Sequence, residues 1–238
     1  MKEIILATAA IACAQAGAAQ EVAYLDLASV TPRTELRRPP VPEKECTVHH
    51  RCGFLKSVNV GGDVSPEDKR SLRTTLMWMD KMEYRDGDRA EVEVMVMNAG
   101  EVPIDVPWTP HLADLQPADD AVPFDVSTFG ISIEMMWPAG NSAQIGTLIL
   151  YGSPDHSGTL LNLKPGEWVR LRGWTTLSLL EYKGAKLRSL AETLGAVANS
   201  WMRLERYSPQ PGGLVVNERN IYPHRLSGPP ISLRLLTD

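Results

Sequence analysis

A series of short segments with alternating apolar and polar residues constrains the fold of this 238-residue chain more than any other feature. In the clearest of them, Ala90, Val92, Val94 and Val96 alternate with charged residues and methionines. A period of two places successive side chains on opposite faces of a strand, so that one face is apolar and the other polar. We therefore expect a half-buried β-strand in this segment.

The same pattern, or a wholly apolar version of it, recurs along the chain. It covers residues 72–79, 129–137, 145–151, 159–163, 168–174 and 231–236. Turn sequences such as Asp86-Gly87-Asp88 separate these segments at short intervals. Short strands with frequent turns are typical of an antiparallel β-sandwich. The sequence thus predicts an all-β domain over residues 71–238.

One segment departs from this pattern. Between residues 183 and 203, Leu187, Leu190, Leu194, Val197 and Trp201 follow a spacing of three and four. That spacing predicts an amphipathic helix, inserted near 183–203, whose apolar stripe packs over an open end of the sandwich. A helix that binds a partner is the alternative.

The first nineteen residues have the features of a secretory signal peptide. Lys2 precedes an apolar stretch from Ile4 to Ala12, and small residues follow up to Ala19. The stretch is too short to span a bilayer, and no other segment approaches that length, so we expect no transmembrane segment. We expect an exported protein, periplasmic or extracellular, that begins near Ala19 or Gln20. A buried N-terminal helix and lipid anchoring at Cys13 are the alternatives.

Residues 20–70 show little periodicity and contain several prolines. We expect an extended N-terminal arm with one edge strand at Val22–Leu27. Cys46 and Cys52 remain after the leader, and in an oxidising compartment such a pair predicts a short disulfide loop. Metal binding is the rival interpretation, because His49 and His50 lie between the two cysteines.

Two turn sequences carry a family resemblance. Residues 94–103 end in Asn98-Ala99-Gly100-Glu101-Val102-Pro103, and residues 163–169 contain Leu163-Lys164-Pro165-Gly166-Glu167. Both resemble turns of bacterial extracytoplasmic immunoglobulin-like domains. The resemblance implies an immunoglobulin-like antiparallel β-sandwich and transfers no active residues. The Cys…Trp…Cys pattern of antibody domains is absent from the sequence.

The sequence favours no catalytic chemistry. It contains none of the common nucleotide-binding, hydrolase or metalloprotease motifs, and we expect no catalytic residues, cofactor or metal. The net charge of −5 predicts no nucleic-acid partner. Three histidines are scattered in predicted loops: His111, His156 and His224. Five acidic residues also fall between predicted strands, as solvated loop acids or, alternatively, as calcium ligands: Asp105, Asp114, Asp119, Asp120 and Asp125.

One predicted strand offers a candidate binding surface. Alternation within residues 168–174 places Trp168, Arg170, Arg172 and Trp174 on one face. Aromatic and arginine side chains are frequent anchors of binding surfaces, and indoles can also stack on sugar rings. In the alternative interpretation, the 183–203 helix covers the tryptophans, and the arginines stack on them.

These observations together predict a non-enzymatic binding or interaction module of the cell envelope. Its expected partner is a protein or a glycan. A carbohydrate-binding module that uses Trp168 and Trp174 is one alternative, and an envelope hydrolase with a site assembled from distant residues is another.

Overall fold

The computed structural model describes residues 19–36, 54–59, 69–119, 121–136, 142–177, 193–210, 213–221 and 224–236. Within these ranges every regular element is a strand, except for the short 3-10 helix η2 (Leu112–Leu115). The expectation of an all-β domain is therefore confirmed for the described residues. The proposed leader up to residue 18 and the cysteine pair Cys46 and Cys52 lie outside the described residues.

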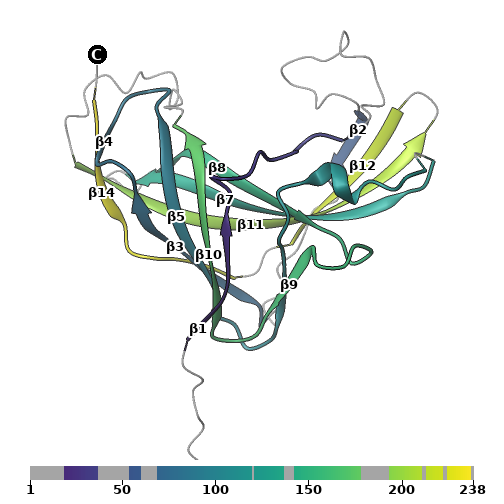
Figure 1. Cartoon of the computed structure of the whole chain (residues 1–238), viewed down its shortest axis with the longest axis horizontal. Coiled ribbons are helices and arrows are strands. Elements are labelled where there is room, and N and C mark those ends of the chain that lie inside the picture. The colour runs from purple at the N-terminus through teal and green to yellow at the C-terminus, as the bar shows by residue number, and fades with distance from the viewer. Residues whose placement is uncertain are drawn as a thin grey trace, which may run out of the picture.

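One sheet has five strands in the order β1-β10-β5-β3-β13 (Figure 1). The three central strands are antiparallel neighbours, whereas β1 runs parallel to β10 and β13 runs parallel to β3. The edge strand expected at Val22–Leu27 overlaps β1. The bounds are β1 (Gln20–Asp26), β3 (Ser71–Met79), β5 (Arg89–Asn98), β10 (Glu167–Thr176) and β13 (His224–Ser227).

The second sheet is built around β11, a strand of 18 residues. One edge of β11 pairs with β7, which in turn pairs with β8, and the other edge pairs with β12 and β14 in succession. β2 extends the sheet beside β12, although the sequence indicated no strand there, and β4 extends it beside β14. The bounds are β2 (Phe54–Asn59), β4 (Glu83–Tyr84), β7 (Phe124–Met136), β8 (Ser142–Gly152), β11 (Thr193–Gln210), β12 (Gly213–Ile221) and β14 (Ile231–Leu235).

The two sheets pack against each other over a shared apolar core. The five-stranded sheet contributes alternate residues of β5, such as Val92 and Val94, and of β10, such as Val169 and Leu171. The larger sheet contributes residues of β7, β8 and β11. A small two-stranded sheet, β6 (Ile104–Pro107) with β9 (Leu160–Leu163), also packs side chains into this core.

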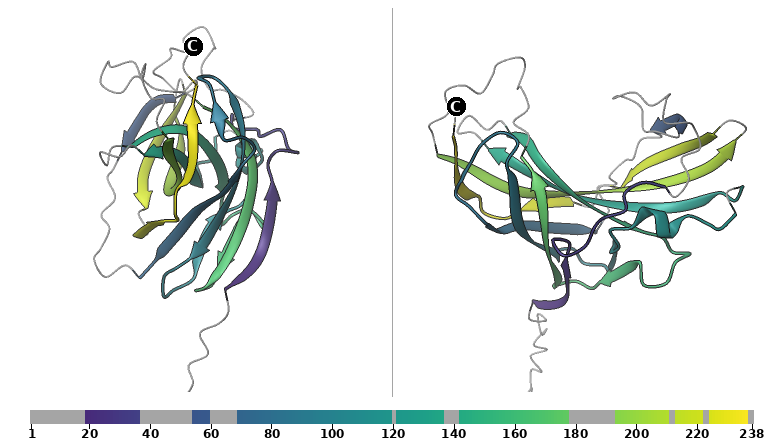
Figure 2. Two further views of the ribbon diagram at one scale, coloured as in Figure 1. Left: turned by 90° about the vertical axis from the view of Figure 1, so that its left-hand side faces the viewer. Right: turned by 45° about the horizontal axis from the view of Figure 1, so that its top comes forward.

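The larger sheet extends beyond the five-stranded sheet and carries a second apolar cluster (Figure 2). Phe124 and Val126 of β7 and Tyr207 of β11 belong to this cluster, whereas the shared core takes Phe129 of β7 and Met202 of β11. Because neighbouring side chains of a strand alternate, the second cluster lies on the opposite face of the sheet. Leu112 and Leu115 of η2 pack on it.

The expected helix near 183–203 is wrong for residues 193–203, which belong to β11. Residues 183–192 lie outside the described part of the chain. Ala196, Ala198, Ser200 and Met202 alternate into the core at a period of two, and the small size of the first three weakened the apolar pattern. Trp201 points away from that core and covers Gly130 of β7, where a Cβ would lie 2.1 Å from its Cε2 atom.

The two turn sequences that carry the family resemblance meet in space at Asn98. The buried Asn98 side chain donates hydrogen bonds of 2.8 Å to the carbonyl groups of Val102 and Leu163. The N–H of Gly100 donates to Asn98 Oδ1 (2.9 Å), and the N–H of Gly166 donates to the Asn98 carbonyl (2.8 Å). Gly166 has a φ of 83°, which glycine adopts without strain. One side chain thus fastens the β5–β6 turn to the β9–β10 turn.

We expect Asn98→Ala to lower the free energy of unfolding by about 3 kcal/mol, because it leaves buried backbone groups without partners. Chemical denaturation of the variant and the wild type measures the difference. The control is Asn162→Ala, which removes an exposed amide that donates to Asp105. An Asn98→Ala loss no larger than that of the control would contradict the role assigned to Asn98.

Tyr84 is a second buried polar side chain with a defined role. Its hydroxyl donates to Asp80 Oδ1 (2.8 Å) and accepts from the N–H of Lys81 (3.0 Å). Burial disfavours the phenolate and raises the pKa of Tyr84 well above its usual value of 10.0, and the bond to Asp80 acts in the same direction. The neutral phenol therefore contributes its full stability below pH 10, the usual pKa of a tyrosine. Above pH 10 this stability is lost, because Tyr84 ionises in the unfolded chain before it ionises in the folded one.

We expect the stability of the wild type to fall above about pH 10, by at most about 1.4 kcal/mol per pH unit for this group. Tyr84→Phe should reduce that slope, because the variant has no phenol to ionise at this position. Denaturation between pH 9 and 11.5 tests it, with Tyr24→Phe, at an exposed tyrosine, as the control. Equal slopes for the wild type and Tyr84→Phe would refute the assignment.

Candidate functional site

The four residues of the predicted binding surface lie on the outward face of β10. Trp168, Arg170, Arg172 and Trp174 alternate with residues that are buried in the core, among them Val169 and Leu171. All four are partly exposed. They therefore lie on the side of the five-stranded sheet that points away from the larger sheet.

Neighbouring strands extend this surface on both sides of β10. Trp168 lies opposite Met97 of β5, and Arg170 lies opposite Met95. On β1, Tyr24 lies opposite Arg170 and is 45% exposed. We call the resulting surface the aromatic face, which consists of Tyr24, Trp78, Arg89, Glu91, Glu93, Met95, Met97, Trp168, Arg170, Arg172 and Trp174.

The guanidinium groups of β10 have partners both within the aromatic face and at its edge. Arg170 lies 4.8 Å from the ring centroid of Tyr24 and forms ion pairs with Glu21 (3.3 Å) and Glu93 (3.5 Å). Arg172 is hydrogen-bonded to Glu91, and this bond raises the pKa of Arg172. The carboxylates thus offset the charge of the guanidinium groups and restrict their orientation on the outer side of the sheet.

The stacking partners differ from those expected in the alternative interpretation. Trp174 stacks with Arg89 of β5, whose guanidinium carbon lies 4.3 Å from the ring centroid, and Arg170 stacks on Tyr24. The segment that was expected to cover the tryptophans as a helix is, over residues 193–203, a strand of the other sheet. Each stacking contact nevertheless holds an aromatic ring in a fixed orientation.

A β-bulge adds Trp78 to the aromatic face. Simple alternation along β3 would bury Trp78 together with Leu72, Thr74 and Leu76. The pairing of β3 with β5 shifts between Leu76 and Trp78, so that Met79 is buried while Trp78 is 45% exposed and lies opposite Glu93. Bulges often redirect a side chain in this way, and no sequence signal marked this one.

The composition of the sheet that carries the aromatic face resembles that of a protein interface. Its five strands contain five arginines and no lysine: Arg73, Arg89, Arg170, Arg172 and Arg225. Tryptophan, tyrosine, methionine and arginine are enriched in interfaces between proteins, and lysine is depleted. Glutamate is depleted there too, so the glutamates of these strands depart from that composition. The face therefore offers flat aromatic and thioether contacts with little unbalanced charge.

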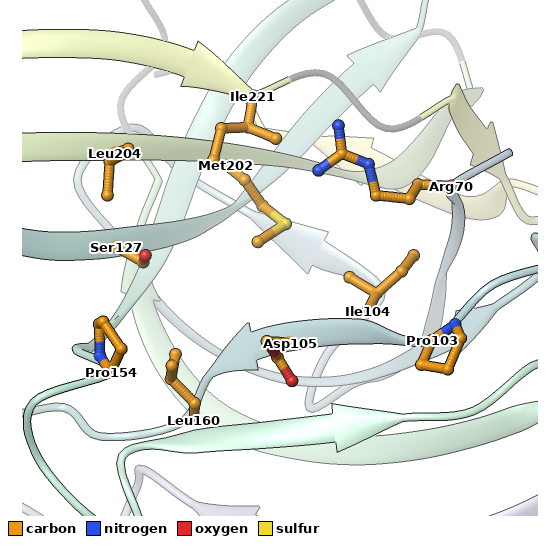
Figure 3. Close-up of a pocket in the computed structure, with 10 residues that line it drawn as sticks. All are labelled: Arg70, Pro103, Ile104, Asp105, Ser127, Pro154, Leu160, Met202, Leu204 and Ile221. Carbon is orange, nitrogen blue, oxygen red and sulfur yellow. The ribbon is translucent and has the colours of Figure 1, made fainter. Parts of the chain in front are cut away.

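A cavity of about 340 Å³ lies between the β6–β9 pair and the larger sheet (Figure 3). Most of its lining residues are apolar, although polar and apolar atoms contribute nearly equal shares of the lining surface. Arg70, which precedes β3, extends its guanidinium group into the cavity (Figure 3). No sequence pattern predicted this cavity, because its walls come from five strands and the loops between them. The lining consists of Arg70, Pro103, Ile104, Asp105, Ser127, Pro154, Leu160, Met202, Leu204 and Ile221.

The histidines and loop acids singled out in the sequence do not gather at one site. Neither His111 nor His156 lines the cavity, and no group of three or more metal-ligating side chains occurs among the described residues. His224 is the first residue of β13. Most of the acids instead have partners of their own. Asp105 accepts a hydrogen bond from Asn162, and Asp119 accepts one within its own turn. Asp114 forms an ion pair with Arg33, and Asp125 forms one with Arg206, while Asp120 lies outside the described residues.

Two facing buried carboxylates of the larger sheet were missed by the sequence analysis. Glu205 of β11 and Glu218 of β12 lie directly opposite each other and are only 2% and 8% exposed. Arg203 approaches both, with Nη1 2.9 Å from Glu218 and 3.7 Å from Glu205, and the Tyr207 hydroxyl donates to Glu205. We interpret this cluster as a buried ion-pair network, because one guanidinium lies within ion-pair distance of both carboxylates.

Comparisons with known proteins give only distant similarities. No protein-family model and no curated protein matches this chain. The described residues also contain no helix that is long and apolar enough to cross a membrane.

Among solved structures, the chain is similar to the sporulation control protein Spo0M of Bacillus subtilis, with 11% identity and a TM-score of 0.27 over 66% of this chain and 50% of that one. It is also similar to the DNA-bound alkylpurine DNA glycosylase AlkC of Pseudomonas fluorescens, with 10% identity and a TM-score of 0.22 over 63% of this chain and 30% of that one. For AvmM, which catalyses macrocyclization in alchivemycin A biosynthesis, the identity is 10% and the TM-score 0.24 over 71% of this chain and 89% of that one. The chain thus spans half the length of Spo0M, and similarities this low carry no functional inference.

Proposed function

We propose that the protein is a non-enzymatic binding module, exported to the cell envelope, that contacts a protein partner through the aromatic face. The observation that carries this proposal is the gathering of Tyr24, Trp78, Trp168 and Trp174 on one outward sheet face beside Met95 and Met97. Such side chains supply most of the binding energy of interfaces when a partner covers them. The bulge at Trp78 supports the proposal, because burying this side chain would be the simpler outcome for a strand without a partner.

A glycan is the second candidate partner. The observation that favours it is the internal pairing of Arg170 and Arg172 with glutamates, which leaves exposed rings without strong net charge. Uncharged sugars stack on such rings, and the paired guanidinium and carboxylate groups provide donors and acceptors for hydroxyl groups.

We also propose that the two packed sheets form an immunoglobulin-like sandwich. The antiparallel order β10-β5-β3, the parallel edge strand β1 and the turns joined at Asn98 support this assignment. In such domains the inner side of each sheet faces the core, and the outer side faces solvent or a partner. A binding role for the aromatic face agrees with this arrangement.

Site-specific photo-crosslinking tests the proposed interface. We expect a photoreactive residue in place of Trp168 to form a discrete crosslinked protein in the native envelope, and Trp78→Ala to weaken that crosslink by about tenfold or more. The matched control carries the probe at Val122, an exposed apolar residue outside the five-stranded sheet. Identical crosslinks from both positions, or none from Trp168, would refute the interface.

A glycan array separates the second candidate from the first. If the wild type binds a glycan on the array and Trp168→Ala abolishes this binding, the proposed partner is a glycan and not a protein. An array without binding, together with a specific protein crosslink, leaves the protein partner as the sole candidate.

The proposed export makes a prediction about the processed chain. We expect mass spectrometry of the envelope form to show a mature start at Ala19 or Gln20, because small residues precede it in the leader. Processing there would leave β1 intact, since this strand begins at Gln20. An uncleaved chain in the cytoplasm would contradict export, and a lipid-modified Cys13 would establish the anchored form instead.

A further inference from the structure

The cavity beside β6 is a second site, separate from the aromatic face. Its volume of about 340 Å³ falls within the range of small-molecule sites. Seven of its ten lining residues are apolar, and Met202 and Ile104 point into it from opposite walls (Figure 3). A concave site that combines apolar side chains with a few placed polar groups is the usual form of a ligand site.

The charge inside the cavity selects the kind of head group. The guanidinium of Arg70 reaches into the space near Met202 and Ile221, whereas the carboxylate of Asp105 points away from them (Figure 3). Asp105 accepts a hydrogen bond of 2.7 Å from Asn162 on the neighbouring strand β9. A guanidinium carries five N–H donors, so Arg70 can bind a carboxylate while it keeps another neighbour.

The strand that borders the cavity is a poor template for a peptide. β6 has only four residues, it ends in Pro107, and Pro103 precedes it. Proline has no N–H donor, and short, proline-flanked edges discourage the pairing of an added strand. These features favour a small molecule over an extended peptide.

We propose that this cavity binds a medium-chain aliphatic carboxylate, with the carboxylate at Arg70 and the alkyl chain against Ile104, Leu160, Met202 and Leu204. A volume of about 340 Å³ is large enough for octanoate, which has ten non-hydrogen atoms. Charge-assisted hydrogen bonds hold the head group, and burial of the chain provides the remaining affinity.

Calorimetric titration of the purified full chain with octanoate tests the proposal. We expect saturable binding to one site, and binding of octylammonium at least tenfold weaker, because the guanidinium repels a cation. Arg70→Gln should weaken octanoate binding by about tenfold or more. Lys69→Gln is the matched control and should leave binding unchanged, because Lys69 is exposed and pairs with Glu101.

Methyl NMR places the ligand independently of any charge variant. Octanoate should shift the Met202 methyl resonance and leave that of Met82, an exposed methionine, in place. The proposal is wrong if octanoate gives no saturable binding at millimolar concentration, if octylammonium binds equally well, or if the Met202 resonance does not move. An apolar peptide that shifts Met202 where octanoate does not would also overturn it.

Discussion

The close approach of β11 to the five-stranded sheet is the contact on which the remaining structure depends. Ala196, Ala198 and Ser200 present small side chains to the shared core, and the Thr74 hydroxyl donates a hydrogen bond of 2.7 Å to Ser200. Larger side chains here would separate the two sheets, because protein interiors have little spare volume. Since β11 also pairs with β7, β12 and β14, this contact positions nearly the whole of the larger sheet.

The same packing determines which surfaces remain outside. Val169 and Leu171 enter the core, so the other side of β10 turns outward with its tryptophans and arginines. The ion pair between Arg170 and Glu93 and the stacking of Arg170 on Tyr24 then connect β10 to the strands on either side of it. Because these contacts restrict the rings before a partner arrives, the rings already have nearly the orientation that a complex would require. Less conformational entropy is then lost on binding.

The aromatic face and the cavity differ in the chemistry that they offer. The face is broad, and its arginines are balanced by carboxylates on adjacent strands, so it suits a large partner that covers many weak contacts. The cavity is small and concave, and Arg70 supplies a positive group to its interior. The two sites use different faces of the molecule, so occupation of one need not disturb the other.

The sequence by itself determined that the described part of the chain is all-β, because alternation in segments such as 89–97 and 168–174 is a local property of the backbone. It also placed Trp168, Arg170, Arg172 and Trp174 on a common face. The sequence could not identify β11, because small residues at a period of two coincided there with larger residues at helical spacing. Only the pairing of β11 with β7 and β12 decided between helix and strand. The bulge that exposes Trp78, the stacking of Arg170 on Tyr24 and the cavity walls join residues far apart in the chain, so tertiary packing alone decided them.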